Sequence, residues 1–562
     1  MKYLPLILGV LSFALLCFSC EEENGAPALS EARTVQSFIF DSFDPAVEAT
    51  INDSLGIIRA ELPFGETAEN LAPTIVVPEG AVIEPASGVA QDFSDFVLYT
   101  VTAENGAQKI YTALVEEGRS SNTTLVNFRL PELYVSANVD PVNATAEFEV
   151  PFGTDLSAVE IEAETSDPEA VTAPASGETV DLTAPLELVV TAADGATTRS
   201  YQVEATVRSQ ATAVRGVWLT NVDSDVLTSE AKIEAAVQRC KDLNINTIFV
   251  VTYNKAATTY PSQVMEELIG VPIDPLYAGR DPLREVIDAA HAEGIKVFAW
   301  FEYGFAAMNG SPGPILDTYP AWAAINVNGE PVVKNGFYWM NALLPEVQQF
   351  MSDLVLEVVN EYPDIDGVQG DDRLPAMPSE GGYDDYTVSL YQDEHGGADP
   401  PANRTDQAWL QWRADILNEW AEQLYNDIKS VNPNCIVAMS PSPLNFGFRE
   451  YLQDYTAWID GGYCDLVSPQ LYRRDNQGIG VYRGLLQDQL FRVGEANKDI
   501  FYPGTLSYLG SYVPQPQFFV DMINANREQG VMGEVHFFYN ALIANEDVFS
   551  VIYPGPATFP DL

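Results

Sequence analysis

Apolar and polar positions alternate through the first part of the chain in a way that predicts paired β-strands. Residues 97–102 are Val-Leu-Tyr-Thr-Val-Thr, residues 109–115 continue the alternation, and Glu104-Asn105-Gly106 stands between the two runs. A period of two is typical of half-buried strands, and Asn-Gly is a favoured hairpin turn. We therefore expect a β-hairpin here and a second one around Asp194-Gly195.

The region that contains these hairpins consists of two copies of one pattern. Pro63-Phe64-Gly65 recurs as Pro151-Phe152-Gly153, and Pro85-Ala86-Ser87-Gly88 recurs as Pro174-Ala175-Ser176-Gly177. A repeat of roughly 90 residues indicates tandem domains rather than solenoid units. We predict two all-β immunoglobulin-like sandwich domains, at residues 35–117 and 123–208. A spacer role is favoured over glycan binding, since neither copy contains Trp.

From residue 213 onwards, short apolar runs alternate with stretches of helical periodicity. Helices are expected at residues 230–242, 282–293, 345–361, 409–430 and 515–529 and near Leu485, and strands at residues 216–222, 247–254, 296–303, 367–372, 436–442, 466–472, 501–507 and 534–539. Eight such strands favour a parallel sheet closed into a (β/α)₈ TIM barrel over residues 213–562. No GxGxxG sequence follows the first strand, which disfavours a dinucleotide-binding open sheet.

Composition narrows the possible function. The chain has 81 Asp and Glu against 28 Lys and Arg, a formal net charge of −53. Such a chain repels nucleic acid, so no nucleic-acid partner is expected, and a strongly anionic substrate would need a locally basic site. Five Cys and three His include no zinc-type spacing outside the leader. We therefore expect neither a metal nor another cofactor.

The N-terminus has the pattern of an export signal. An apolar run at residues 4–18 follows Met-Lys-Tyr and ends at Ser19-Cys20, and it is too short to span a membrane. This end resembles a bacterial lipoprotein signal with Cys20 as the lipidated residue, and Glu21-Glu22-Glu23 resembles the surface-export tag of Bacteroidetes-type lipoproteins. We expect a signal peptide at 1–20, an acidic linker at 21–34 and a surface-exposed outer-membrane lipoprotein. A plain secretory signal is the alternative.

In a (β/α)₈ barrel the reacting groups lie at the carboxyl ends of the strands. Here these ends carry aromatic rings, amides and carboxylates, which stack on sugar rings and bond their hydroxyls. A polysaccharide is therefore the expected substrate. The candidate substrate-binding residues are Trp218, Asn221, Tyr253, Asn254, Trp300, Tyr303, Gln369, Arg373, Ser440, Gln470, Tyr472 and Tyr508.

Three carboxylates at strand ends are the catalytic candidates: Asp371, Asp372 and Glu302. Glycoside hydrolysis uses one carboxyl group as proton donor and another as nucleophile or base. Asp372 is expected to contact the scissile bond, with Asp371 or Glu302 as its partner. Because neighbouring strand residues point to opposite sides, Asp371 facing the barrel wall is left open. Which group is the acid also stays open.

Several barrel motifs occur in a characteristic order: Arg215-Gly216-Val217-Trp218-Leu219, Ala299-Trp300-Phe301-Glu302, residues 341–347, residues 366–372 and Ser468-Pro469-Gln470-Leu471-Tyr472. Over residues 213–541 the chain thereby resembles the glycosyl hydrolase-like 10 family, and its N-terminal repeats resemble those of Bacteroidetes surface proteins. The resemblance implies a (β/α)₈ lipoprotein enzyme that cleaves peptidoglycan glycan strands without stem peptides. It also implies a catalytic centre at the two aspartates.

Two residues next to these aspartates depart from the family pattern. Gly370 stands where a bulky residue is commoner, and Arg373 stands where an aromatic residue is common. These departures leave the substrate open. A non-catalytic surface glycan-binding protein, in which the barrel has lost turnover, is the alternative function, and a hydrolase of another bond is a third.

Overall fold

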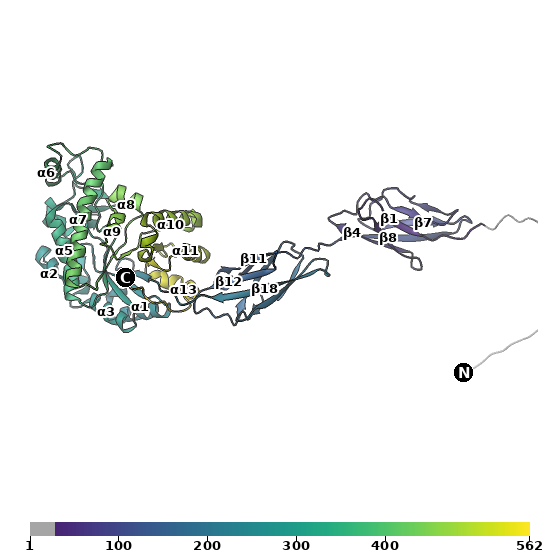
Figure 1. Ribbon diagram of the computed structural model, residues 1–562, viewed down its shortest axis with the longest axis horizontal. Coiled ribbons are helices and arrows are strands. Elements are labelled where there is room, and N and C mark those ends of the chain that lie inside the picture. Colours follow the sequence, from purple (N-terminus) through teal and green to yellow (C-terminus); the bar gives the residue numbers. More distant parts are fainter. Residues whose placement is uncertain (1–28) are drawn as a thin grey trace, which may run out of the picture. The chain divides into compact units, whose positions relative to one another are not determined.

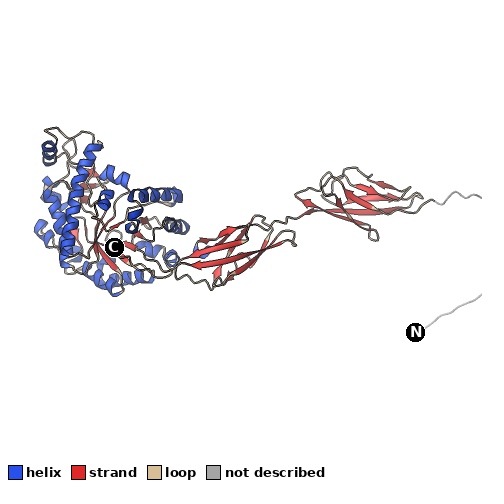
Figure 2. Ribbon diagram, in the orientation of Figure 1, coloured by secondary structure: helices blue, strands red, loops and turns tan. Residues whose placement is uncertain are grey.

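The computed structural model describes residues 29–562, so the expected signal peptide and Cys20 lie outside the described residues. Two β-rich regions precede a region in which strands and helices alternate, as the two colours in Figure 2 show. Within residues 29–562, no helix has both the length and the apolar character that a membrane span requires.

The first β-rich region is a sandwich of two sheets around one apolar core. The core contains Phe38, Phe40 and Tyr99, with the Phe38 and Tyr99 ring centroids 5.3 Å apart. The strands are β1 (Ser37–Phe40), β2 (Val47–Glu48), β3 (Thr50–Asn52), β4 (Ile57–Phe64), β5 (Thr74–Val76), β6 (Val82–Glu84), β7 (Val97–Thr102) and β8 (Gln108–Gly118). Their order is β3-β4-β8-β7-β6 in one sheet and β2-β1-β5 in the other.

The hairpin predicted in this region is confirmed. Strands β7 and β8 pair antiparallel, with Val97 opposite Ala113 and Thr102 opposite Gln108. At the turn, the Ala103 N–H donates to the Ala107 carbonyl at 2.8 Å. Gly106 has a φ of 87°, a left-handed conformation that glycine adopts without steric cost.

The second β-rich region repeats this arrangement. Its five-stranded sheet has the order β11-β12-β18-β17-β15, and smaller sheets have the orders β10-β9-β14 and β13-β16. The strands are β9 (Leu125–Leu130), β10 (Val135–Ser136), β11 (Asn138–Asp140), β12 (Thr145–Val150), β13 (Val159–Glu160), β14 (Glu162–Thr165), β15 (Val171–Ala173), β16 (Thr179–Val180), β17 (Leu186–Thr191) and β18 (Thr198–Val207). The prediction of two all-β sandwiches is confirmed.

The C-terminal region contains an eight-stranded parallel sheet surrounded by helices (Figure 1). In the order in which they follow one another around the barrel, starting from the first, its strands are β19 (Arg215–Leu219), β20 (Thr247–Val251), β23 (Lys296–Phe301), β27 (Gly367–Gly370), β28 (Ile436–Met439), β29 (Leu466–Val467), β30 (Gly504–Leu506) and β31 (Glu534–Phe537). The main surrounding helices are α1 (Glu230–Asp242), α3 (Pro282–Ala292), α5 (Pro345–Glu361), α7 (Gln407–Val431), α10 (Ile479–Val493) and α11 (Pro516–Glu528).

The sheet closes on itself between β29 and β30, through isolated bridges instead of a regular ladder. Val467 bridges Phe501, and Gln470 bridges Gly504. The Tyr502 N–H donates to the Val467 carbonyl, and the Leu471 N–H donates to the Gly504 carbonyl, both at 2.9 Å. Pro469 and Pro503 have no N–H to donate, so a continuous ladder cannot form here. The predicted (β/α)₈ barrel is confirmed, with its sixth strand shorter than expected.

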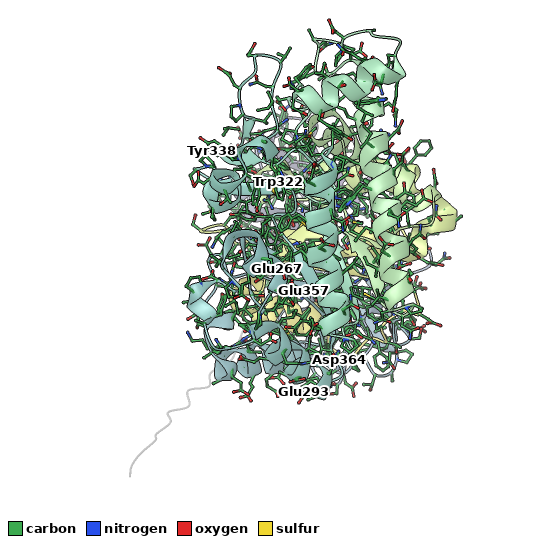
Figure 3. The ribbon with its side chains drawn as sticks, turned by 90° about the vertical axis from the view of Figure 1, so that its left-hand side faces the viewer. Glu267, Glu293, Trp322, Tyr338, Glu357 and Asp364 are labelled. Atoms are coloured by element: carbon green, nitrogen blue, oxygen red, sulfur yellow. The ribbon has the colours of Figure 1, made fainter. Side chains whose placement is uncertain are left out.

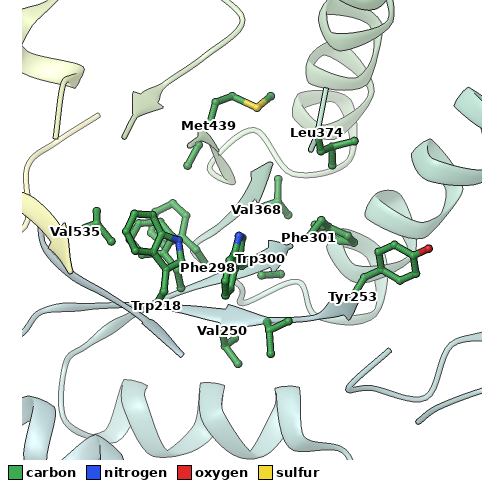
Figure 4. Packing of buried hydrophobic residues seen from close by; sticks show 14 of the residues in the cluster. Trp218, Val250, Tyr253, Phe298, Trp300, Phe301, Val368, Leu374, Met439 and Val535 are labelled. Carbon is green, nitrogen blue, oxygen red and sulfur yellow. The ribbon is translucent and has the colours of Figure 1, made fainter. Parts of the chain in front are cut away.

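Aromatic side chains fill the interior of the barrel, as the close view in Figure 4 shows. The Trp218 and Trp300 ring centroids are 6.3 Å apart, and those of Trp218 and Phe249 are 6.0 Å apart. The indole N–H of Trp218 donates to the Gln369 side-chain carbonyl at 2.7 Å. The barrel is therefore a packed core, and a ligand can reach only its ends.

The amino ends of the barrel strands lie at one end of the barrel, and their carboxyl ends lie at the other. In Figure 3, Trp322 and Tyr338 lie near one end, and Glu293 and Asp364 lie near the other. Glu293 precedes β23 and Asp364 precedes β27, whereas Trp322 and Tyr338 follow β23, so the first pair marks the amino ends of the strands and the second pair marks the carboxyl ends.

The segments between and after the barrel strands contain elements that the sequence pattern did not predict. A small antiparallel sheet has the order β24-β26-β25, and β21 pairs with β22. These elements are β21 (Tyr253–Asn254), β22 (Ala257–Thr258), α2 (Gln263–Ile269), β24 (Ala306–Asn309), α4 (Gly313–Thr318), β25 (Val333–Lys334), β26 (Phe337–Trp339), α6 (Asp385–Glu394), α8 (Leu444–Tyr451), α9 (Tyr455–Asp460), α12 (Asn540–Ala544) and α13 (Glu546–Ile552).

Candidate active site

Glu302 follows β23 directly and is held by the Asn254 side-chain amide, which follows β20. The Asn254 side-chain amide donates to Glu302 Oε2 at 2.8 Å and to Asn221 Oδ1 at 2.6 Å. Burial is the main cause that raises the pKa of the Glu302 carboxyl, and the positive charge of Arg373 partly offsets it. Glu302 is thus a fixed carboxyl group that keeps its proton to a higher pH than an exposed glutamate.

Asp371, the first residue after β27, is buried. Its Oδ1 accepts a hydrogen bond from the Gln470 amide at 2.6 Å, and its Oδ2 lies 3.3 Å from an Arg373 guanidinium nitrogen. Burial raises the pKa of Asp371 well above its usual value, and the neighbouring charge of Asp372 adds to this effect. The side chain connects the end of β27 to the segment after β29.

Asp372 is the more accessible of the two aspartates. Its side chain is 28% exposed, against 5% for Asp371, so Asp372 is the one that a substrate can touch. Its Oδ1 lies 3.4 Å from the Arg373 guanidinium. The same oxygen is buried and has no hydrogen-bond partner among the residues that the structure describes. A ligand can therefore reach Asp372 only through the remaining, exposed part of its side chain.

Arg373 connects the three carboxyl-bearing residues. One of its terminal nitrogens donates to the backbone carbonyl of Glu302 at 2.8 Å and lies within 3.4 Å of both aspartates. The guanidinium also stacks on Phe337 at 4.8 Å and on Tyr303 at 5.6 Å from the ring centroids. The arginine that departs from the family pattern is thus the cation at the centre of the site.

The backbone around these residues folds back very tightly. A Cβ on Gly370 would lie 2.4 Å from the Leu374 carbonyl oxygen, which explains why a bulky residue is absent there. Gly304 has a φ of +49°, and a Cβ on it would lie 2.3 Å from the Arg373 carbonyl oxygen. That oxygen accepts the Phe305 N–H at 3.0 Å. Two glycines therefore let the Arg373 segment approach the end of β23.

Replacing Gly304 by Ala is expected to lower the free energy of unfolding of the barrel by about 3 kcal/mol, from strain and overpacking combined. The matched control is Gly310→Ala, because Gly310 also has a positive φ, +79°, but nothing lies within 4 Å of its added Cβ. The control should lose only about 1 kcal/mol. Urea unfolding measures both, and equal losses would contradict the close approach.

The remaining predicted substrate-binding residues divide into a buried and an accessible group. The buried ones are Trp218, Tyr253, Asn254, Trp300, Tyr303, Gln369 and Ser440. The rings of Trp218, Tyr253 and Trp300 pack in the core, so they offer little surface for stacking on a sugar. Asn221, Arg373, Gln470, Tyr472 and Tyr508 keep part of their surface exposed at the carboxyl ends of the strands.

Several residues near the carboxylates were missed by the sequence reasoning. Lys255 is close enough to lower the pKa of Glu302, although its effect is smaller than those of burial, Arg373 and Asn254. Phe337 stacks on Arg373. Lys255 directly follows the predicted Asn254, which was the available signal, whereas Phe337 lies in an unpredicted strand.

A metal site is a separate question. In the part of the chain that the structure describes, no group of three or more His, Cys, Asp or Glu side chains is arranged to hold a metal ion. Lys255 and Arg373 instead place positive charges beside the carboxyl groups, within a strongly acidic chain.

Comparison with known proteins gives family matches for both parts of the chain. Residues 213–489 match the family described as glycosyl hydrolase-like 10. Residues 36–115 and 125–205 match the family described as SGBP, N-terminal, where SGBP denotes surface glycan-binding protein.

Curated relatives agree with the first match. Glycosyl hydrolase DigH of Escherichia coli (strain K12) is 28% identical over 313 residues, covering 48% of this chain and 67% of the relative. Glycosyl hydrolase YngK of Bacillus subtilis (strain 168) is 25% identical over 402 residues, covering 62% of this chain and 73% of the relative.

Among solved structures, the PgaB (BpsB) glycoside hydrolase domain from Bordetella bronchiseptica aligns with a TM-score of 0.45 and 14% identity, over 60% of this chain and 99% of that chain. The family matches and the two curated relatives agree with the barrel as the fold of a glycoside hydrolase. Residues 213–489 are therefore a glycosyl hydrolase-like 10 domain, and the protein that carries it is a glycoside hydrolase.

Proposed function

We propose that the protein cleaves a polysaccharide with Glu302 as the proton donor and Asp372 as the nucleophile or base. The observation that carries this proposal is the contrast between the two carboxyl groups around one arginine. Burial raises the pKa of Glu302, while Asp372 is accessible and lies 3.4 Å from the Arg373 cation. Two carboxyl groups in unlike environments are what acid-assisted glycoside hydrolysis needs.

Asp371 has a positioning role in this proposal. It is buried, and both its carboxyl oxygens are engaged, by Gln470 and by Arg373. A substrate has little access to it. The side chain of its neighbour Asp372 is 28% exposed, which favours Asp372 for contact with the reacting sugar.

For the substrate we propose peptidoglycan glycan strands that have lost their stem peptides. Removal of a stem peptide leaves a carboxylate on every second sugar. The net charge of −53 would repel such a chain, but Lys255 and Arg373 provide positive charges at the site, which an anionic substrate requires. Neutral polysaccharides remain the alternative, because Asn221, Gln470 and Tyr472 bind hydroxyls without needing a charge.

The test is product release from a glycan panel, measured by mass spectrometry with the full chain and its Asp372→Asn variant. The panel contains peptide-free peptidoglycan strands, chitin oligomers and neutral plant and algal polysaccharides. Products from peptide-free strands that the variant does not release would support the whole proposal. Products from a neutral polymer alone would replace the substrate, and products that the variant still releases would contradict the role of Asp372.

A second candidate function is a non-catalytic surface glycan-binding protein. The match of two N-terminal regions to SGBP N-terminal domains is the observation that favours it. The same panel separates the two functions, because a binding protein retains a glycan without releasing any product from it.

We also propose that the protein is a lipoprotein of the outer membrane, exposed at the cell surface. The sequence up to Cys20 and the SGBP N-terminal matches support this. In this arrangement the domains at residues 35–117 and 123–208 act as a spacer between the lipid anchor and the barrel at residues 213–562.

Replacing Cys20 by Ala should release the protein from membranes, because the acylated residue is then absent. Fractionation followed by immunodetection measures this, and Cys17→Ala is the matched control in the same leader, expected to stay membrane-bound. Continued membrane association of the Cys20→Ala variant would contradict the anchor.

A further inference from the structure

A hollow of about 690 Å³ opens at the barrel mouth, on the side opposite Glu302. It is lined by Asp223 and Asp225 after β19, Tyr508 after β30, and Asn540 and Ile543 of α12. These segments all follow the carboxyl ends of neighbouring strands, in the order β30, β31 and β19. The hollow therefore lies on the same end of the barrel as the catalytic carboxyl groups.

A series of aromatic rings connects this hollow to the carboxylates. Tyr472 contacts Phe537 at 5.2 Å between centroids, Phe537 contacts Phe538 at 5.4 Å, and Phe538 contacts Tyr508 at 5.3 Å. Phe538 is buried, whereas Tyr472, Phe537 and Tyr508 keep exposed surface. At the other end of the series, Asp371, Asp372 and Glu302 are close enough to Tyr472 to help burial raise the pKa of its hydroxyl.

The hollow has a fixed shape and a polar lip. The Asn540 amide donates to the Asp223 carbonyl at 2.9 Å, which joins the segment after β19 to α12. Tyr508 meets the buried Phe538 edge to face, with planes at 88°, so its ring cannot lie down against the core. An aromatic ring beside amide and carboxylate groups is the usual composition of a site for a sugar ring.

The charge of the lip decides which sugar fits. Asp225 is neutralised by Lys232 at 2.6 Å, but Asp223 brings a further carboxylate to the hollow. The negative charge of Asp223 repels a sugar that carries an acid group, whereas the hydroxyls of an uncharged sugar can bind here. The basic side chains at the catalytic carboxylates have the reverse preference, since Lys255 and Arg373 attract an acid.

We propose that this hollow is a distal subsite for an uncharged sugar unit of the same glycan whose bond is cut at Asp372, reached along Tyr472, Phe537 and Tyr508. The inference rests on the proposed function, which supplies the cleavage site. It implies that the enzyme binds chains long enough to cross the barrel mouth and cuts inside them. It also implies a register, with acid-bearing units at the carboxylates and uncharged units in the hollow.

The test measures binding by calorimetry in the full chain that carries Asp372→Asn, so that no probe is consumed. The probes are chitin oligomers and peptide-free peptidoglycan fragments, each two and six sugars long. Adding Tyr508→Ala should weaken binding of the six-sugar probe about tenfold and leave the affinity for the two-sugar probe unchanged. Tyr508→Phe, which keeps the ring, should restore most of the affinity, and Tyr386→Ala, at an exposed tyrosine of α6, should change nothing.

Unchanged six-sugar affinity in Tyr508→Ala, or an equal loss for both probe lengths, would overturn the subsite. The same holds if no six-sugar probe binds. The proposed function fails separately. If the unmutated chain releases no product from any glycan while six-sugar binding still depends on Tyr508, the catalytic proposal is wrong and the subsite stands. If products appear and Tyr508 has no effect on six-sugar binding, the subsite is wrong and the catalytic proposal stands.

Discussion

Replacing Asp372 by Asn is expected to lower kcat at least about a thousandfold on whichever glycan the protein cleaves, because an amide can serve neither as nucleophile nor as base. The fold should survive the change. Arg373 still donates to the Glu302 carbonyl and still faces Asp371, so its charge keeps a partner. Kinetics on the active glycan measure the loss, and thermal unfolding monitors the fold.

The control for this variant is Asp393→Asn. Asp393 is an exposed aspartate of α6, in the long segment after β27, so the same chemical change is made away from the carboxylate cluster. It should leave kcat within about twofold, as surface changes away from special contacts usually do. Near-normal turnover in a folded Asp372→Asn variant would remove Asp372 from the mechanism.

Replacing Glu302 by Gln is expected to remove the alkaline fall of the pH profile as well as most of the activity. A proton donor works only while it is protonated, and burial raises the pKa of Glu302, so its protonated form persists to a higher pH than that of an ordinary carboxyl group. In the unmutated enzyme, kcat/KM should therefore decline as the pH rises through this raised pKa. The Gln variant has no proton to lose there.

The variant should lose about a hundredfold or more on natural glycans. It should lose much less on an aryl glycoside whose leaving group needs no protonation. Asp371→Asn is the comparison that separates the two carboxyl groups, because burial also raises the pKa of Asp371. If the alkaline fall persists in Glu302→Gln and vanishes in Asp371→Asn, then Asp371 is the acid and Glu302 is not.

The regular part of the barrel was predictable because its periodicity is strong. Helices α1 and α5 begin and end at the predicted residues, and β23 begins at the predicted Lys296. The strand predicted at residues 466–472 ends after Val467, because Pro469 breaks the hydrogen-bond ladder while the apolar pattern continues. The small sheet of β24, β25 and β26 is stabilised by long-range contacts that leave no periodic signal.

The candidate site was predictable as a set of strand ends but not as a geometry. The order of the strands brings Glu302, Asp371 and Asp372 to neighbouring positions, which the sequence pattern already indicated. The unequal exposure of Asp371 and Asp372 depends on the turn at Gly370, where the backbone comes within contact of Leu374. The central position of Arg373 depends in the same way on Gly304, which lets the Arg373 backbone come close to the end of β23. Apart from the glycines themselves, the sequence gives no signal for either of these two close backbone contacts.

The order of the strands also has a consequence for the protein during its synthesis. The first barrel strand, β19, pairs with the last, β31, and the family match ends at residue 489, before β30 and β31. A nascent chain that has emerged only as far as β29 therefore has two open sheet edges, at β19 and β29. Such edges pair readily with other chains. Because the last two strands are synthesised late, the growing polypeptide can aggregate until residues 501–537 pair with β29 and β19 and close the barrel.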